Sequence, residues 1–239
     1  MAQAVVRGCL VRRQSPPHVR MLRQRIHDAA VRAGNDPSLR ISVRHSTALE
    51  VLLMGRSCAQ ILRSCMTLVV STSLARECCE ALVKVEGLPK LLAVIRSCNR
   101  SKPHMEVLRH VLRILENVAL HPPFLNALAE APSAVETLVE LLQTYRPDDH
   151  VFVPAGRLLL RACDCESGSH ARADLTHVNV QRRLQGSLRL LERKAEAEKN
   201  KSKSMRLQGS GRKVELVEAI RVLRGILKVT APDTSRSSM

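Results

Sequence analysis

Cysteine and histidine are the residues of this sequence best suited to catalysis or metal binding, and their spacing supports neither. Cys163, Cys165 and His170 could supply three metal ligands, but a zinc site normally needs a second ligand pair at a recognisable spacing. The pair Cys78-Cys79 is flanked by glutamates and lacks the basic neighbour that activates a thiol. No catalytic triad, paired carboxylates or glycine-rich phosphate loop can be recognised. The sequence therefore predicts a non-enzymatic protein without a metal or cofactor.

The first residues offer a different chemistry, that of a helix that inserts into a partner protein. Gln3, Arg7, Gly8 and Arg12 fit the spacing Q-x-x-x-R-G-x-x-x-R of an IQ motif, although Ala2 stands where isoleucine is usual. In such helices apolar side chains enter a methionine-rich groove, glycine allows close approach, and arginines face an acidic surface. Residues 1–15 are therefore predicted to bind calmodulin or a calmodulin-like light chain. The predicted contacts are Gln3, Val6, Arg7, Gly8, Leu10, Val11 and Arg12. The alternative is an ordinary basic helix that lies against the rest of the protein.

The positive charge lies mainly in the two flanks of the chain. Of the net charge of +16, residues 1–46 contribute +7, residues 47–163 contribute +2 and residues 164–239 contribute +7. Basic flanks favour polyanionic partners such as acidic proteins, a filament surface or nucleic acid. Nucleic acid is the weaker alternative, because the flanks lack aromatic side chains for base stacking and no known binding motif is present.

The composition indicates helices packed on helices. Leu, Val and Ala dominate the apolar residues, and Phe124, Phe152 and Tyr145 are the only aromatic ones. The cysteines lie mainly within apolar helical runs, as expected of core residues in a reducing compartment. No stretch approaches the roughly 18 apolar residues of a membrane helix, and the arginines near the N-terminus do not fit a signal peptide.

A repeat with an offset of 47 positions runs through the middle of the sequence. Residues 87–96 align with residues 134–143, so that Leu88, Leu91, Leu92 and Ile95 match Val135, Leu138, Val139 and Leu142. The same offset relates residues 105–115 to 152–162, and places Ile61, Cys65 and Leu68 before Leu108, Leu112 and Leu115. Repeats of about 40–47 residues built from two or three helices are typical of armadillo and HEAT proteins. The predicted fold is an all-α, armadillo/HEAT-like α-solenoid of about three repeats with basic flanking helices.

Changes in composition divide the chain into five predicted parts. Residues 1–15 form the IQ helix, 16–46 a basic helical linker and 47–165 the armadillo-like repeats. Residues 166–208 form a loop followed by a basic charged helix. Residues 209–239 contain a short amphipathic helix, with Val214, Val217, Ile220, Leu223 and Leu227 on one side, and a disordered tail.

One predicted helix, residues 105–119, carries the residues expected at a partner groove. Solenoids normally bind partners on their concave surface. Arg109, His110 and Arg113 could line that surface, and the alternative is that they form an ordinary solvated face. Residues 116–128 resemble the ending of an armadillo repeat, where an asparagine ties helix ends together, which implies a structural role for Asn117.

Several stretches resemble the C-terminal helical region of the abnormal spindle (microcephaly-associated) family. The most specific is IRSCNRS (95–101) followed by Met105, and RHSTALEVLL (44–53), LVELLQTYR (138–146) and EAIRVLRGIL (218–227) occur in the same order. The resemblance covers roughly residues 1–230. It implies a fragment of a larger protein that binds calmodulin and organises spindle microtubules. The implied locations are the cytoplasm, the cytoskeleton and the spindle pole, with the nucleus in interphase as a further one.

The function predicted from these observations is a non-enzymatic interaction scaffold. It would bind calmodulin at its N-terminus and an unidentified protein in the solenoid groove. It would reach microtubule and spindle-pole components through the parent protein. The main alternative is a structural module that caps the IQ helix and supports oligomerisation.

Overall fold

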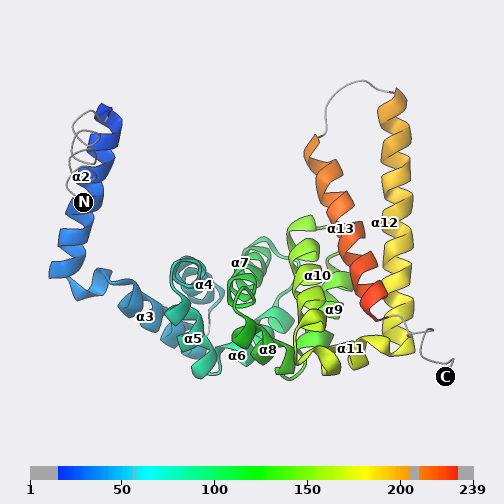
Figure 1. Cartoon of the computed structure of the whole chain (residues 1–239), viewed down its shortest axis with the longest axis horizontal. Helices are drawn as coiled ribbons and strands as arrows, with labels where there is room; N and C mark the ends of the chain where they lie inside the picture. Colours follow the sequence, from blue (N-terminus) through cyan, green and yellow to red (C-terminus); the bar gives the residue numbers. More distant parts are fainter. Residues whose placement is uncertain (1–15, 56, 205–209, 231–239) are drawn as a thin grey trace, which may run out of the picture. The chain divides into compact units, whose positions relative to one another are not determined.

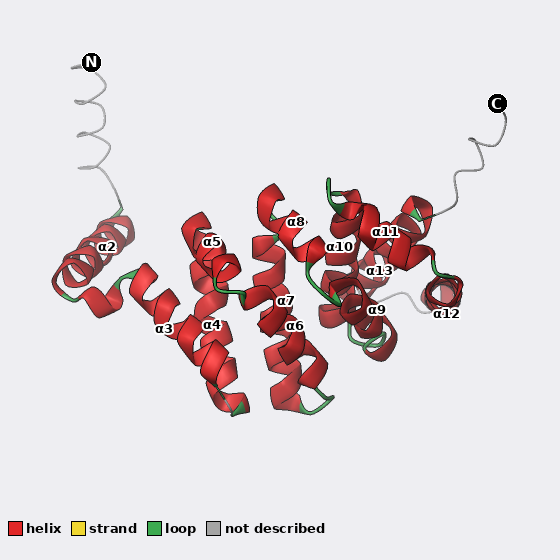
Figure 2. Cartoon of the chain, turned by 90° about the horizontal axis from the view of Figure 1, so that it is seen from below, coloured by secondary structure: helices red, strands yellow, loops and turns green. Residues whose placement is uncertain are grey.

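The computed structural model describes residues 16–55, 57–204 and 210–230, and the regular elements in these ranges are all helices (Figure 1; Figure 2). The prediction of an all-α fold is therefore confirmed. Contacts between residues divide the chain into two units, Met1–Thr47 and Ala48–Met239.

The first unit contains α2 (Pro17–Asn35), the 3-10 helix η1 (Pro37–Leu39) and the start of α3 (Ile41–Met54). Proline suits the first turn of a helix because its fixed φ fits and its missing N–H would be unpaired there, so α2 begins at Pro17. Between α2 and η1, the Asp36 carboxylate accepts a hydrogen bond of 2.9 Å from the Ser38 backbone N–H. The predicted basic helical linker, residues 16–46, thus contains a helix followed by a turn.

The second unit is built from helices in groups of three. Each helix packs on the helix three places later in the chain: α4 on α7, α7 on α10 and α10 on α13 form one layer, α5, α8 and α11 a second, and α6, α9 and α12 a third. This order of packing is compatible with a solenoid of three-helix repeats. The helices of this unit are α4 (Cys58–Leu74), α5 (Arg76–Lys84), α6 (Gly87–Ser97), α7 (Lys102–Val118), α8 (Pro122–Glu130), α9 (Ala134–Thr144), α10 (Asp149–Asp164), α11 (Gly168–Thr176), α12 (Val178–Ser204) and α13 (Ser210–Val229).

The offset of 47 positions appears again in the backbone. Helix α9 begins 47 positions after α6, and α10 begins 47 positions after α7. The residues just before α6 and α9, Glu86 and Ser133, both adopt the left-handed conformation, with φ of 56° and 61°. All eight matched apolar residues of α6 and α9 are buried. The offset fits less well between α4 and α7, because α7 begins 44 positions after α4.

The packed core extends beyond the predicted end of the repeats at residue 165. The predicted loop after Cys165 is wrong from Gly168 onward, since α11 begins there and buries Ala171 and Leu175 completely. A Cβ atom at Gly168 would press against the carbonyl oxygens of Ala162 and Cys163, so only glycine allows this close turn from α10 into α11. The polar residues around Gly168 look like a loop because their two buried neighbours give too short a pattern to reveal a helix.

The last helix also buries a different face from the predicted one. Ile220 and Leu223 are buried as predicted, but Val217 is 63% exposed. Leu216, Ala219, Val222 and Ile226 complete the buried face. Helix α13 begins at Ser210, and the tail predicted after it lies outside the described residues from position 231 onward. In Figure 1, α12 and α13 lie side by side, and α13 also packs against α10.

Close packing of α10 against α13 depends on Gly156. A Cβ atom at this position would overlap Cγ1 of Val222, whereas a Cβ atom at Gly186 on α12 would meet no atom within 4 Å. We expect Gly156→Leu to lower the free energy of unfolding by about 1–3 kcal/mol through overpacking. The control Gly186→Leu should raise it by about 0.5–1 kcal/mol, because glycine is a poor helix former. Urea unfolding followed by far-ultraviolet circular dichroism measures both, and shifts in the same direction would contradict this account.

Candidate partner-binding groove

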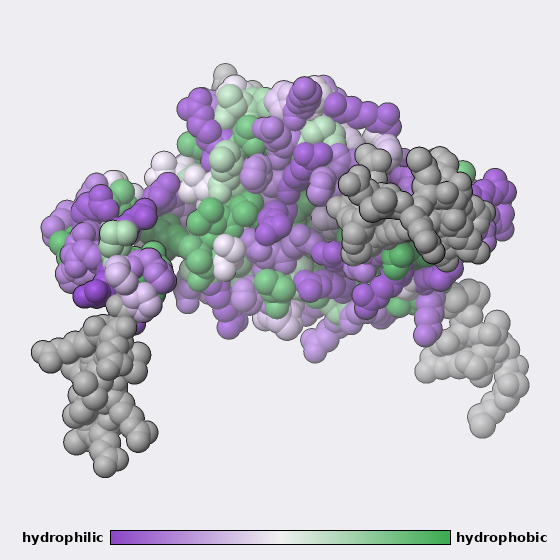
Figure 3. Space-filling model, turned by 90° about the horizontal axis from the view of Figure 1, so that it is seen from above, coloured by the Kyte–Doolittle hydropathy of each residue, from purple (hydrophilic) through white to green (hydrophobic). Residues whose placement is uncertain are grey.

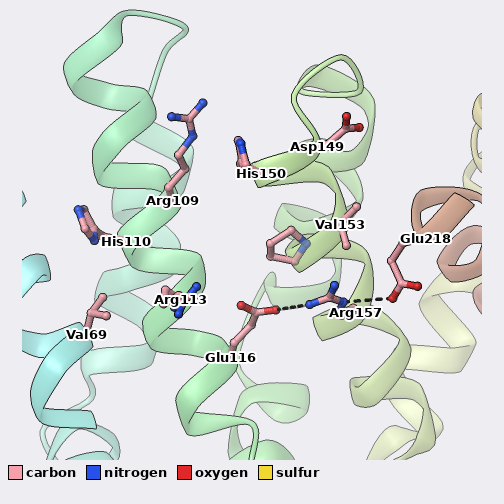
Figure 4. A pocket seen from close by; sticks show the side chains of 11 residues that line it. Val69, Arg109, His110, Arg113, Glu116, Asp149, His150, Val153, Arg157 and Glu218 are labelled. Atoms are coloured by element: carbon pink, nitrogen blue, oxygen red, sulfur yellow. Dashed lines mark hydrogen bonds and ion pairs between the residues drawn. The ribbon is translucent and has the colours of Figure 1, made fainter. Parts of the chain in front are cut away.

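A groove of about 870 Å³ lies across one layer of helices in the second unit. Helices α4, α7, α10 and α13 contribute its walls, and Figure 4 shows the side chains of α7 and α10 that face into it. All three residues predicted for a partner groove, Arg109, His110 and Arg113, lie in the lining. The full lining is Val69, Arg109, His110, Arg113, Glu116, Asp149, His150, Val153, Pro154, Arg157 and Glu218.

The amphipathic pattern of α7 explains why its charged residues face the groove. Its apolar residues at helical spacing are buried between the neighbouring helices: Val107, Leu108, Val111, Leu112, Ile114, Leu115 and Val118. The polar residues between them must then lie on the opposite face of the helix. This places Arg109, His110, Arg113 and Glu116 along one wall.

Most charges of the groove are paired across helices. Arg109 forms an ion pair of 2.8 Å with Asp148, whose other carboxylate oxygen caps α10 by accepting the His150 N–H at 3.0 Å. Arg157 lies between Glu116 at 3.6 Å and Glu218 at 3.4 Å, so one guanidinium links α7, α10 and α13 (Figure 4). These side chains are partly exposed, and each such pair contributes at most about 1 kcal/mol to stability. Their main effect is to neutralise two of the three arginines in the lining.

The other basic residues of the lining have no such partner. The side chains of Arg113, His110 and His150 form no ion pair or hydrogen bond with any other residue that the structure describes. Arg113 is an exposed residue on α7, and Figure 4 shows it between His110 and Glu116. Its guanidinium is therefore available to an anionic group from outside the chain.

No direct signal in the sequence points to the α10 and α13 side of the groove, although the repeat offset could have identified part of it. Position 110 plus the offset of 47 leads to Arg157, so the repeat places His110 and Arg157 at equivalent positions of α7 and α10. Glu218 belongs to a helix that the repeat alignment did not include.

Comparison with known proteins identifies relatives of half of the chain. Over 122 residues, it is 38% identical to the abnormal spindle-like microcephaly-associated protein homolog of Mus musculus, 37% to that of Saimiri boliviensis boliviensis and 36% to that of Canis lupus familiaris. Half of this chain is similar to abnormal spindle proteins. The recognition made from the sequence is thus confirmed. The matched segment covers 50% of the chain and 4% of the length of each relative. No protein-family profile and no solved structure matches the chain.

The residues predicted from the sequence to bind calmodulin lie outside the described part of the chain. This applies to Gln3, Val6, Arg7, Gly8, Leu10, Val11 and Arg12. The helix that follows them, α2, is described and has an exposed surface. Leu22 and Ile26, four positions apart, are 56% and 61% exposed, with Arg23 and Arg25 between them. Helix α2 therefore has exposed apolar and basic side chains.

Asn117, for which the armadillo resemblance implied a structural role, links two helices of the groove layer. From α7, its Nδ2 donates to the Val69 backbone oxygen at 3.1 Å and to Thr72 Oγ1 at 3.0 Å, both on α4. The Thr72 hydroxyl can accept this bond because it donates its own hydrogen to the Leu68 carbonyl at 2.7 Å. The amide thus joins α7 to α4, two of the helices that line the groove.

Replacing Asn117 with alanine is expected to lower the free energy of unfolding by about 1–3 kcal/mol, because two polar atoms of α4 lose their partner. Asn126 on α8 is a suitable control, since its side chain forms no hydrogen bond with the other described residues. Asn126→Ala should change stability by less than about 0.5 kcal/mol. Urea midpoints measure both effects, and equal midpoints for the two variants would argue against the link.

The cysteines of the described core are poorly suited to nucleophilic chemistry. Burial raises the pKa of both Cys65 and Cys163 to about 12, and it raises the pKa of Cys79 and Cys98 to about 11. Thiols with such pKa values are almost fully protonated near neutral pH. Within the described ranges, no three His, Cys, Asp or Glu side chains are arranged to hold a metal ion. The same ranges contain no helix that is both long and apolar enough to span a membrane.

Proposed function

We propose that this chain is a non-enzymatic interaction scaffold that acts in spindle organisation as part of a larger protein. The observation that carries the proposal is the groove on α4, α7, α10 and α13, where the guanidinium of Arg113 lies in the lining without an ion pair to another described residue. Such a surface suits recognition of another protein. The spindle assignment is supported by the names of the relatives, which are abnormal spindle-like proteins.

A second binding element in this proposal is the basic N-terminal segment, which would bind calmodulin or a calmodulin-like light chain. The IQ spacing of residues 3–12 supports it. The exposed apolar and basic residues of α2 extend the kind of surface that calmodulin-like partners bind. The proposed location is the cytoskeleton at the spindle pole. Interphase nuclei are a further proposed location, and microtubule contacts would be made through the parent protein.

Two measurements test this function. Light scattering of the chain mixed with calmodulin should show the mass of a complex, both with calcium and with a chelator to define its calcium dependence. In dividing cells, the tagged parent protein should concentrate at spindle poles. Absence from spindle poles would refute the spindle assignment, and absence of a calmodulin complex would refute the N-terminal binding element.

The second candidate function is an oligomerisation module, and the exposed apolar side chains of α2 favour it. Met21 is 68% exposed, and Leu22 and Ile26 are nearly as accessible, so this helix could pair with a second copy. Light scattering of the chain alone distinguishes the two functions. Self-association without calmodulin binding would support the oligomerisation module and contradict the scaffold.

A further inference from the structure

The groove has three properties that together restrict what it can bind. It has an unpaired guanidinium, it has acidic residues in the same lining, and it borders an apolar stripe on α4. The inference drawn from them rests on the proposed function, because it specifies the kind of protein segment that the groove would take.

The first property is the position of positive charge. Arg109 and Arg157 are held by acidic side chains of the chain itself, at 2.8 Å from Asp148 and 3.4 Å from Glu218. Arg113 has no such partner among the described residues, and His110 lies next to it in the lining. A carboxylate of a ligand could therefore pair with Arg113 without breaking an existing ion pair. This favours a ligand with an acidic side chain at one defined place.

The second property, the acidic side chains, argues against a uniformly charged polyanion. Glu116, Asp149 and Glu218 lie in the same lining as the arginines. A nucleic acid strand would bring phosphates close to these carboxylates, and the lining has no Phe, Tyr or Trp on which bases could stack. A peptide can place its charges individually, so the mixed wall suits a peptide better than a polyphosphate.

The third property is the apolar surface of α4 beside the groove. Val69 lines the groove, and Met66 and Val70, three positions before it and one after, are 51% and 55% exposed. Met66 and Val70 are four positions apart, which places them on one face of the helix. Figure 3 shows hydrophobic side chains gathered in a patch among hydrophilic ones on one face of the molecule. A ligand that spans from α4 to α7 would gain binding free energy by burying apolar side chains next to its acidic one.

The backbone of α10 offers a further contact for an extended chain. Pro154 lies inside this helix and also lines the groove. Proline has no N–H, so the carbonyl oxygen of His150, four residues earlier, cannot receive the usual helical bond from it. This oxygen could accept a hydrogen bond from the backbone N–H of a bound peptide, which favours an extended segment with free N–H groups over a helix.

From these properties we propose that the groove binds an extended segment of a partner protein that places an acidic side chain against Arg113 and aliphatic side chains against Met66, Val69 and Val70. The experiment is a selection from a phage library of random dodecapeptides on the immobilised full chain. The recovered peptides are then synthesised with a fluorescent label, and their affinity is measured by fluorescence anisotropy.

Three variants make the test specific. Arg113→Glu reverses the unpaired charge, Val70→Asp disrupts the apolar stripe, and Arg189→Glu makes the same change as the first variant on an exposed site of α12 outside the groove. All three sites are exposed, so circular dichroism should show an unchanged fold. We expect recovered peptides to combine acidic and aliphatic residues. Their affinity should fall at least about ten-fold for Arg113→Glu and for Val70→Asp, and less than about two-fold for Arg189→Glu.

Two outcomes would overturn the inference. One is that the recovered peptides bind Arg113→Glu as tightly as the unsubstituted chain. The other is that no peptide is recovered while a labelled short single-stranded DNA binds in a way that depends on Arg113, which would make the groove a nucleic-acid site. Calmodulin binding, measured on the same variants, should stay unchanged. A chain that binds calmodulin normally but fails the peptide test would keep the scaffold proposal and lose only this one.

Discussion

Replacing Phe152 with alanine should lower the free energy of unfolding by about 3–5 kcal/mol. Phe152 lies on α10, is 0% exposed and is the largest of the fully buried side chains in the described core. Helix α10 packs against α7, α8, α9, α11 and α13, so a cavity at this position weakens contacts to the helices on both sides of it. Because α13 packs mainly on α10 and α12, the cavity should also weaken the attachment of α13.

Urea unfolding followed by far-ultraviolet circular dichroism is the appropriate measurement for Phe152→Ala, because the chain has no tryptophan for fluorescence. The control is Leu120→Ala in the turn after α7, where the side chain is 63% exposed. This change should alter stability by less than about 0.5 kcal/mol. If Phe152→Ala had as small an effect as the control, α10 would not be the centre of the core that the structure describes.

The repeat offset is the part of the fold that could be predicted best from the sequence. Residues at positions 88, 91, 92 and 95 and their partners 47 positions later are buried, because each short helix exposes one apolar face that only its neighbours can cover. The ends of α7 can also be inferred from prolines. Pro103 fits the first turn of α7, and the prolines at 122 and 123 fit the first turn of the next helix, so α7 must end before them. These features are local, so a single sequence is enough to detect them.

Helices α12 and α13 were both predicted, but the faces that they bury could not be, because this burial depends on contacts with distant parts of the chain. Helix α12 has many charged residues, but Leu184, Leu191 and Ser187 are buried where it packs on α9 and α13. In α13, Val217 and Ile220 are both apolar and three positions apart. In the structure, Val222 is buried where α10 approaches closely at Gly156, and Val217 is left exposed. The packing of neighbouring helices determines which apolar residues are buried, and the sequence pattern of a single helix is not enough to predict it.

For the candidate site, the sequence predicted the residue types on one wall but not their pairing. Arg109 and Arg113 are alike in the sequence, four positions apart on one helix. The structure distinguishes them, because the N-terminal turn of α10 brings Asp148 to Arg109 and no acidic residue of the described chain pairs with Arg113. The difference between a residue that stabilises the groove and one that is free to bind a partner thus depends on how α7 and α10 pack.

The combined substitution Val6→Asp and Leu10→Asp should remove calmodulin binding. The two residues lie four positions apart in the IQ pattern, and their apolar side chains are proposed to insert into calmodulin. Two carboxylates would have to enter the methionine-rich groove of calmodulin without polar partners, which should cost about 3 kcal/mol or more of binding free energy. This corresponds to an increase in Kd on the order of a hundredfold. Isothermal titration calorimetry of the full chain with calmodulin measures this change.

The matched control for this double substitution is Val178→Asp with Leu190→Asp. Both control residues lie on α12 and are 66% and 48% exposed, so the control adds the same two charges away from the N-terminus. It lowers the net positive charge of the chain equally, and therefore separates loss of apolar anchors from a general weakening of attraction to acidic calmodulin. The control should bind within about two-fold of the unsubstituted chain. If the Val6 and Leu10 variant bound calmodulin as tightly as this control, residues 3–12 would not be the binding element, and the exposed apolar residues of α2 would be the next segment to substitute.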